Sequence, residues 1–231
     1  MNLVHHFWYF QSALSSQFCD QLIKHASSLK DNIALTGNIT NQSGELISRR
    51  NQAGRLITTK KPKKNKKKLS KKDLLDLRKK RNSNVVWLDE RWIYNEIQPY
   101  IHIANKNAGW NFQFDFTESC QFTKYNKGQF YGWHTDSWEL PYNAPKDPNL
   151  HGKIRKLSIT ISLSDPKDYK GGELEFQLRN KDKAQLIRKC PEIKPRGSIV
   201  VFPSFVWHRV KPVTKGIRHS LVAWNLGFPF K

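Results

Sequence analysis

Two histidines and one aspartate in the second half of the chain have the types and spacing of a metal site. His134 and Asp136 are separated by one residue, and His208 follows a separate strand-like run, Gly197–Phe202. If His134 and Asp136 lie in one β-strand, their side chains point in the same direction. Two imidazoles and one carboxylate can cover one face of an iron(II) ion and leave the other face open. A His-x-Asp tripeptide alone is more often structural, and it is the third residue that makes a metal site the expectation.

An arginine follows at a position where a charge needs a partner. Arg218 comes ten residues after His208 and stands in an apolar stretch with Ile217 and Leu221. A buried guanidinium group is unfavourable unless it meets an anion, and its planar fork suits a carboxylate held by two hydrogen bonds. Ser220 lies on the same strand face. We expect Arg218 to bind a carboxylate, either that of a ligand or, as the alternative, that of an acidic residue in an internal salt bridge.

Together these residues resemble a known family. The run from Tyr125 to Asp136 (YNKGQFYGWHTD), the later Gly171-Gly-Glu-Leu174, and His208 with Arg218 are similar to the 2-oxoglutarate- and iron(II)-dependent dioxygenases. Within that family they look like the prolyl 4-hydroxylase-like branch. The resemblance covers about residues 110–230 well and the N-terminal helices loosely, whereas residues 31–83 match no part of it.

The resemblance implies a cofactor set and a reaction. Fe(II), 2-oxoglutarate as cosubstrate and O₂ would be required, with ascorbate as a stimulant. His134, Asp136 and His208 would bind the iron, and Arg218 would hold the distal carboxylate of 2-oxoglutarate with help from Tyr125 and Ser220. Decarboxylation of 2-oxoglutarate to succinate would be coupled to hydroxylation of a C–H bond.

The resemblance also implies a substrate class. Tyr131, Arg155 and Trp224 match positions that line the substrate side in protein prolyl hydroxylases, so the expected substrate is a proline in a peptide. Tyr131 could equally be a rim aromatic, and Trp224 a core residue. Collagen-type prolyl hydroxylases have lysine where this chain has Arg218. That departure favours the oxygen-sensing, ribosomal-protein and bacterial subgroups, and it leaves lysyl hydroxylation open.

Two further functions are alternatives. One is nucleic-acid demethylation by the same chemistry, which the net charge of +21 favours. Against it, no Arg-x-Asn-x-Thr-x-Arg run follows His208, as it does in demethylases that resemble AlkB. The other is a non-catalytic jelly-roll that binds nucleic acid or a ribosome, which would have no need of an intact triad and Arg218.

The elements that must position these residues are two helices followed by many short strands. Apolar residues at helical spacing predict a helix over residues 16–30, capped by Ser16, and another from Asp89 to Gly109 that Pro99 should kink or split. Alternation of Phe112, Phe114 and Phe116 with polar residues predicts a strand. Further strands are expected over 119–125, 156–163, 173–178, 198–202 and 219–224, separated by turn-rich segments at 141–152, 165–172 and 211–216. This order predicts a mainly β fold with flanking α-helices, and the resemblance specifies a double-stranded β-helix (jelly-roll, cupin-like) core.

Composition bounds the remaining properties. We expect residues 1–231 to form one oxygenase domain, with a flexible Lys-rich loop over about 31–83, a core over about 110–231, and a monomeric state. The segment Lys60–Arg81 contains 13 basic and 2 acidic residues, so it can contact a polyanion such as nucleic acid or a ribosome. The alternative is a solvated, disordered loop that aids solubility. The chain shows no signal-peptide pattern and no apolar run of about 20 residues. Three widely spaced cysteines predict no disulfide framework, so a cytoplasmic location is expected.

Overall fold

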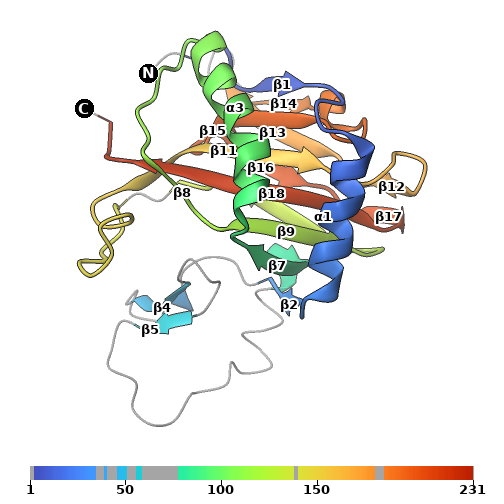
Figure 1. The fold of residues 1–231 in the computed structure, drawn as a ribbon, viewed down its shortest axis with the longest axis horizontal. Coiled ribbons are helices and arrows are strands. Elements are labelled where there is room, and N and C mark those ends of the chain that lie inside the picture. The colour runs from blue at the N-terminus through green and yellow to red at the C-terminus, as the bar shows by residue number, and fades with distance from the viewer. Residues whose placement is uncertain are drawn as a thin grey trace.

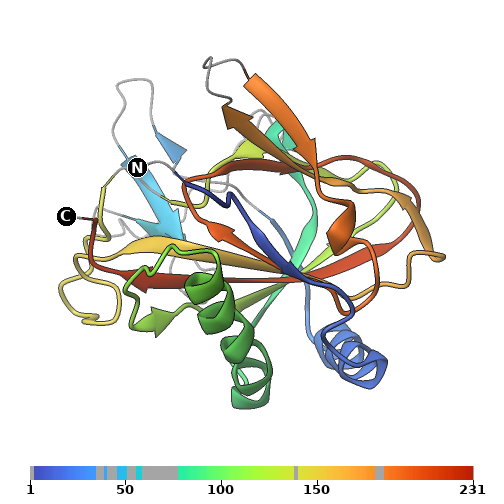
Figure 2. The same ribbon diagram turned by 90° about the horizontal axis from the view of Figure 1, so that it is seen from above.

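The computed structural model describes residues 3–34, 39–40, 46–50, 56–58, 78–137, 140–179 and 185–230. In this part of the chain a larger and a smaller β-sheet face each other, and two helices cover the outer face of the larger sheet (Figures 1 and 2). This is the mainly β fold with flanking helices, built on a double-stranded β-helix, that the sequence predicts.

The larger sheet provides most of the scaffold. Its eight strands follow the order β1-β15-β11-β18-β9-β7-β2, with β8 paired to β18 off this path. All of its pairs are antiparallel. The strands are β1 (Trp8–Phe10), β2 (Asn32–Ile33), β7 (Asn84–Leu88), β8 (Phe116–Thr117), β9 (Cys120–Tyr125), β11 (Ile154–Ser162), β15 (Ile199–Pro203) and β18 (Arg218–Gly227).

The smaller sheet carries the two histidines of the predicted metal site. Its five strands follow the order β14-β13-β16-β10-β6. They are β6 (Arg81–Asn82), β10 (Phe130–His134), β13 (Leu174–Arg179), β14 (Gln185–Lys189) and β16 (Trp207–Val210), and a 3₁₀ helix, η1 (Pro191–Ile193), follows β14. Two small sheets complete the described chain: β12 (Tyr169–Gly171) with β17 (Val213–Gly216), and β3 (Ile39–Thr40), β4 (Leu46–Arg50) and β5 (Leu56–Thr58).

Alternation along the central strands gives the larger sheet two different faces. Successive residues of a strand point to opposite faces of the sheet. In β11, Leu157, Ile159 and Ile161 pack into the core beneath the helices, whereas Ser158 and Thr160 face the smaller sheet. The same division holds in β9 and β18, where Phe122, Leu221 and Ala223 join the helix-side core and Gln121, Tyr125, Arg218, Ser220 and Trp224 line the space between the sheets. The larger sheet therefore presents an apolar face to the helices and a polar face to the predicted site.

The two helices cover that apolar face (Figure 2). They are α1 (Ser16–Ser28) and α3 (Arg91–Asn107), and both place aliphatic side chains in the same core, with Leu22, Ile93, Ile97 and Ile101 fully buried. The predicted cap is off by one residue, because Ser15 and not Ser16 precedes α1, with its Oγ accepting a hydrogen bond from Phe18 N at 3.1 Å.

Proline does not split α3, contrary to that part of the prediction. Pro99 lies inside a single α-helix of 17 residues. A proline removes one backbone hydrogen bond from a helix interior. Here Ile97 and Ile101, on either side of it, are fully buried in the core, and this burial holds both turns of the helix against the sheet.

The strand predicted over Phe112–Phe116 is also wrong for most of its length. Asn105 occupies the backbone groups that a strand would pair: its Oδ1 accepts from Phe112 N, and its Nδ2 donates to Phe112 O, both at 2.9 Å. Asn111 adopts a left-handed conformation with φ 51°. Regular strand structure begins only at Phe116, in β8.

Two segments expected as turns contain strands. Residues 169–171 and 213–216 pair as β12 and β17 in a ribbon at the end of the sheets, visible in Figure 1. Most of the Lys-rich segment, residues 60–77, lies outside the described residues, as does most of the loop expected over 31–83.

All three cysteines are free and buried, in agreement with the absence of a disulfide framework. Burial raises the pKa of the Cys120 and Cys190 thiols to about 12, and it also raises the pKa of Cys19. Among the described residues, neither helix is long and apolar enough to cross a membrane.

We predict that Gly197→Ala is far more destabilising than Gly109→Ala. Both glycines have positive φ, 74° and 69°, and a left-handed alanine costs roughly 1–2 kcal/mol. A Cβ at Gly197 would also lie 2.1 Å from the Leu14 carbonyl oxygen, whereas a Cβ at Gly109 would meet no atom within 4 Å. The clash should add about 1–3 kcal/mol. Urea denaturation of both variants measures the difference, and equal losses would show that the Leu14 contact is unimportant.

Candidate metal centre and active site

The structure brings the three predicted ligands together between the two sheets. His134 ends β10 and lies directly opposite His208 in β16. Asp136 lies between the two rings, with Oδ1 at 3.6 Å from His134 Nε2 and Oδ2 at 3.6 Å from His208 Nε2. One ligand atom from each residue lies within 4.8 Å of the others, and within the described chain no other group of three histidine, cysteine or acidic side chains converges in this way.

Backbone carbonyls orient both imidazoles. His134 Nδ1 lies 2.8 Å from Gly132 O, and His208 Nδ1 lies 2.9 Å from Val206 O. A carbonyl oxygen only accepts, so each Nδ1 carries the proton and donates it, and each Nε2 keeps its lone pair for a metal. Burial lowers the pKa of His134 to about 3, with a further contribution from His208. His134 is therefore neutral at physiological pH, as a metal ligand must be.

Asp136 is held by the backbone of the opposite sheet and not by strand geometry. β10 ends at His134, and Asp136 lies in the bend that follows, so the expectation that both residues project from one strand is wrong. The backbone N–H groups of Asp136 and Ser137 both donate to Ser204 O, at 2.8 and 2.9 Å. Ser204 follows β15, so this contact ties the bend to the turn that leads into β16.

The Asp136 carboxylate is buried and remains ionised. Ser158 Oγ donates to Oδ2 at 2.7 Å and lies 2.9 Å from Ser204 Oγ. Burial alone would raise the pKa of Asp136, but the neighbouring His208, His134 and Arg155 side chains outweigh it and hold the pKa below its usual value. The Trp224 indole N–H also helps to lower this pKa, although it forms no hydrogen bond of standard geometry. Two imidazole nitrogens and a carboxylate oxygen on one side of a pocket fit a divalent iron ion.

Arg218 lies in the same pocket as the three predicted ligands. It is 2% exposed, its Nη1 donates to Ser220 Oγ at 3.2 Å, and its guanidinium lies 5.4 Å from the centre of the Tyr125 ring. Among the described residues no carboxylate pairs with it, so the internal salt bridge is absent there. Gly172 makes room for it, because a Cβ at that position would lie 2.8 Å from Arg218 Cδ. A buried cation with these neighbours suits the carboxylate of a ligand.

Of the three residues expected on the substrate side, two line the pocket. The Tyr131 ring stacks on His134 with centroids 3.4 Å apart, and burial raises the pKa of Tyr131 to about 12. Trp224 is 5% exposed and also lines the pocket. Arg155 lies beyond Trp224, with its guanidinium 3.8 Å from the centre of the indole ring, and forms an ion pair with Glu118. Burial alone would lower the pKa of Arg155, but the neighbouring Glu118 carboxylate outweighs burial, and the pKa is raised above its usual value.

Several residues of the site carried no clear signal in the sequence. Ser158 and Ser204 belong to runs that look like ordinary buried strand, although the alternation of Ser158, Thr160 and Ser162 with aliphatic residues could have indicated a polar inner face. Arg81 lines the pocket and is 5% exposed. In the sequence it is the last residue of the basic segment Lys60–Arg81, for which the charge predicts contact with a polyanion.

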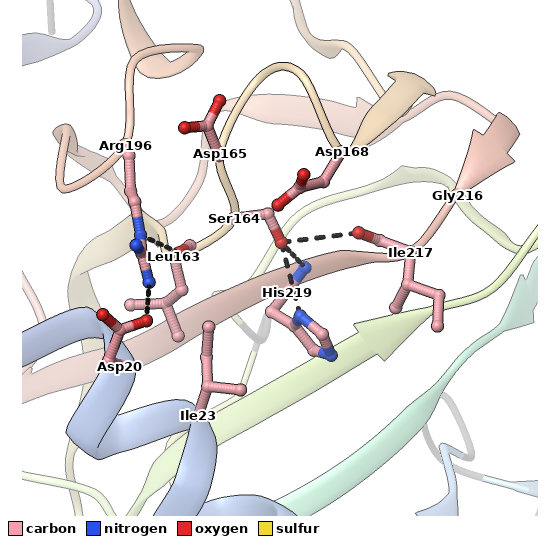
Figure 3. A pocket seen from close by; sticks show the side chains of 10 residues that line it. All are labelled: Asp20, Ile23, Leu163, Ser164, Asp165, Asp168, Arg196, Gly216, Ile217 and His219. Carbon is pink, nitrogen blue, oxygen red and sulfur yellow. Dashed lines mark hydrogen bonds and ion pairs between the residues drawn. The ribbon is translucent and has the colours of Figure 1, made fainter. Parts of the chain in front are cut away.

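A hollow larger than this pocket lies elsewhere in the described chain. The pocket between the ligands and Arg218 has a volume of about 40 Å³, whereas an open hollow near α1 and the start of β18 has a volume of about 500 Å³. Figure 3 shows the latter, in which Arg196 donates to Asp20 and to Leu163 O, and Ser164 contacts His219. Its arginine is already paired with Asp20, and among the described residues no triad of ligand atoms converges in it. We therefore place the chemistry at the smaller pocket.

Comparisons with known proteins match the part of the chain that contains this site. Residues 120–225 match the model of the 2OG-Fe(II) oxygenase superfamily. A PKHD-type hydroxylase of Synechococcus sp. strain CC9902 is 41% identical over 98 residues, 42% of this chain and 36% of that protein. A PKHD-type hydroxylase of Pseudoalteromonas atlantica is 36% identical over 106 residues, 45% of this chain and 41% of that protein. The chain thus spans less than half the length of these curated relatives.

Solved structures support the fold. The viral collagen prolyl hydroxylase of Paramecium bursaria chlorella virus-1 superposes with a TM-score of 0.58 at 18% identity, covering 97% of both chains. A Pseudomonas putida prolyl-4-hydroxylase gives a TM-score of 0.55 at 18% identity, covering 96% of this chain and 92% of that one. Residues 120–225, which contain the triad and Arg218, thus match the 2OG-Fe(II) oxygenase superfamily, and the curated relatives are PKHD-type hydroxylases.

Ser158→Ala should weaken metal binding by about 10-fold or more, because loss of a hydrogen bond to a metal-binding carboxylate typically costs 10–100-fold in affinity. Ser162→Ala is a matched control on the same strand, since Ser162 Oγ is buried and has no hydrogen-bond partner in the described structure. Titration of both variants with Mn(II) measures the affinity. Equal affinities would mean that Ser158 does not position Asp136.

His219, which lines the hollow in Figure 3, should make stability depend on pH. Burial, Lys124 and Arg218 lower the pKa of His219 to about 4 from its usual 6.5. Below pH 6.5 His219 becomes protonated in the unfolded chain but stays neutral in the folded chain. The free energy of unfolding therefore falls from pH 6.5 to about pH 4. At pH 5 the loss due to His219 is up to about 2 kcal/mol. Urea denaturation at pH 7 and pH 5 measures this effect. Between these pH values the free energy of unfolding should fall less in His219→Gln than in the parent, and an equal fall in both proteins would show that His219 is not its cause.

Proposed function

We propose that this chain is an Fe(II)- and 2-oxoglutarate-dependent dioxygenase that hydroxylates a prolyl residue in a peptide. One observation carries the proposal: His134, Asp136 and His208 converge in a buried pocket that also contains Arg218, a buried cation without an acidic partner among the described residues. The superfamily match over residues 120–225 supports the reaction class.

The side chains divide into three roles. His134, Asp136 and His208 would hold the metal from one side, with Ser158 and two backbone carbonyls fixing their orientation. Arg218, assisted by Ser220 and Tyr125, would hold the distal carboxylate of 2-oxoglutarate. When bound, iron with 2-oxoglutarate and O₂ supplies the oxidising chemistry that converts a C–H bond to C–OH and releases succinate and CO₂. Asp136, His208 and Arg218 are buried between the two sheets, and the low dielectric constant there would strengthen every charged contact within the pocket.

The substrate side is the part of the pocket at Tyr131 and Trp224. Both rings are held in place, Tyr131 by stacking on His134 and Trp224 by the guanidinium of Arg155. We propose that they contact the prolyl ring and that Arg155 acts through Trp224. Support for a peptide comes from a Trichoplax adhaerens prolyl hydroxylase solved with a hypoxia inducible factor peptide, which superposes with a TM-score of 0.51 at 18% identity.

Broader properties complete the proposal. We propose one domain over residues 1–231, a monomer, a cytoplasmic location and stimulation by ascorbate, and we keep contact of Lys60–Arg81 with a polyanion as a prediction. The free, buried cysteines support a reducing compartment.

The test is succinate production from 2-oxoglutarate with Fe(II) and O₂, with and without a proline-rich peptide library. The parent protein should turn over faster with peptides, and the modified peptide should gain the mass of one oxygen atom on proline. Asp136→Ala should lose activity by several orders of magnitude, because the ion loses its only anionic ligand in the described site.

Two outcomes would contradict the proposal. Hydroxylation found on lysine alone would replace the prolyl assignment with lysyl hydroxylation. Bound iron without any succinate formation would indicate a binding protein on an oxygenase scaffold.

A further inference from the structure

Arg81 places a second buried guanidinium group in the pocket. It belongs to β6 and lies directly opposite Tyr131 of β10. Gly132 permits this close approach, because a Cβ there would already lie 3.0 Å from the Lys80 carbonyl oxygen. The Arg81 guanidinium lies 4.3 Å from the centre of the Tyr131 ring, which in turn stacks on His134. Arg81 thus lies against the aromatic ring that stacks on one of the metal ligands, in the same pocket as Arg218.

The hydrogen bonds of Arg81 leave one edge of its guanidinium group free. Nε donates to Ser83 Oγ at 3.0 Å, and Nη1 makes only a long contact of 3.5 Å with Gln121 Oε1. Nη2 is buried and has no partner. No carboxylate pairs with Arg81 among the residues that the structure describes. A buried, unsatisfied charged donor is unfavourable, and the two Nη groups together form the edge that binds a carboxylate through two hydrogen bonds.

The charges of the pocket leave room for one more anion. A divalent iron ion and doubly charged 2-oxoglutarate cancel each other. The remaining charged side chains of the lining are Arg81 and Arg218 against Asp136. The loaded pocket therefore keeps a net positive charge in a place of low dielectric constant, where an additional carboxylate would be strongly attracted.

We propose that Arg81 binds a carboxylate of the substrate, so that the preferred peptides carry an aspartate or glutamate close to the hydroxylated residue. The inference rests on the proposed function for the identity of the reaction, but the carboxylate contact can be measured by binding alone. 2-Oxoglutarate is the less favoured occupant, because its distal carboxylate already has Arg218, Ser220 and Tyr125 as a complete set of partners.

The experiment compares two peptides that differ in one residue only. One has aspartate and the other asparagine beside the same proline, so a carboxylate is replaced by an uncharged amide. Protein loaded with Mn(II) and 2-oxoglutarate under nitrogen is titrated into each fluorescein-labelled peptide, and anisotropy gives the affinity. The parent should bind the aspartate peptide about 30-fold or more tightly than the asparagine peptide, the effect expected when one partner of a buried charge pair is removed. Arg81→Gln should bind both equally, and Arg81→Lys should keep part of the preference.

Two controls separate this contact from folding and from cosubstrate binding. Arg188→Gln removes an exposed guanidinium outside the pocket and should keep the full preference of the parent. Arg81→Gln should keep the parent's affinity for 2-oxoglutarate, measured by titration of the Mn(II) protein, whereas Arg218→Gln should lose it. Circular dichroism checks that each variant is folded, and the comparison of the two peptides on the parent needs no variant.

The outcomes are distinct. Equal binding of both peptides by the parent overturns the inference, and loss of 2-oxoglutarate affinity in Arg81→Gln would assign Arg81 to the cosubstrate instead. An aspartate preference without any hydroxylation would support Arg81 as a carboxylate-binding residue and reject the proposed function. Hydroxylation of both peptides with equal affinity would keep the function and reject the role of Arg81.

Discussion

The pairing of β10 with β16 is the constraint on which the site depends. His134 and His208 are 74 positions apart in the chain, and only their direct opposition in this antiparallel pair brings their rings side by side. The carboxylate between them comes from a bend, and the bend is held because Ser204 O accepts two consecutive backbone N–H groups. The same Ser204 lies just after β15, the strand that β1 and β11 hold in the larger sheet. The ligands therefore derive their geometry from backbone hydrogen bonds that join both sheets.

The larger sheet contributes the environment. Because residues alternate between its two faces, one face is filled with aliphatic side chains under α1 and α3, and the other presents serine, threonine, glutamine and arginine to the pocket. A rigid apolar layer on one side makes the polar groups on the other side hard to displace. In this arrangement Arg81 and Arg218 are both buried in one small pocket. A buried guanidinium group of this kind suits an anionic ligand.

The sequence predicted the parts of this structure that depend on spacing along the chain. The triad, Arg218 and both helices follow from residue type and period, and the family resemblance supplied the fold in which they meet. What it could not predict depends on contacts between distant segments. Asn105 captures the backbone of Phe112 and prevents a strand that the alternating phenylalanines favour. Glu118 neutralises Arg155, and nothing near either residue in the chain indicates this pair. The burial of Arg81 could not be predicted either, because a residue at the end of a basic run is expected to be an exposed surface charge. Only the pairing of β6 with β10 buries it in the pocket.

The three buried cysteines have a consequence for the chemistry of the protein in air. A thiol reacts as its thiolate, and with pKa values near 12 almost none of Cys120 or Cys190 is ionised at neutral pH. Alkylating reagents and peroxide can therefore attack these sulfur atoms only when the surrounding structure opens. Cys19 lies in α1, Cys120 in β9 and Cys190 just after β14, so the rates of their labelling would report separately on the undocking of a helix, the opening of the larger sheet and the fraying of the smaller one.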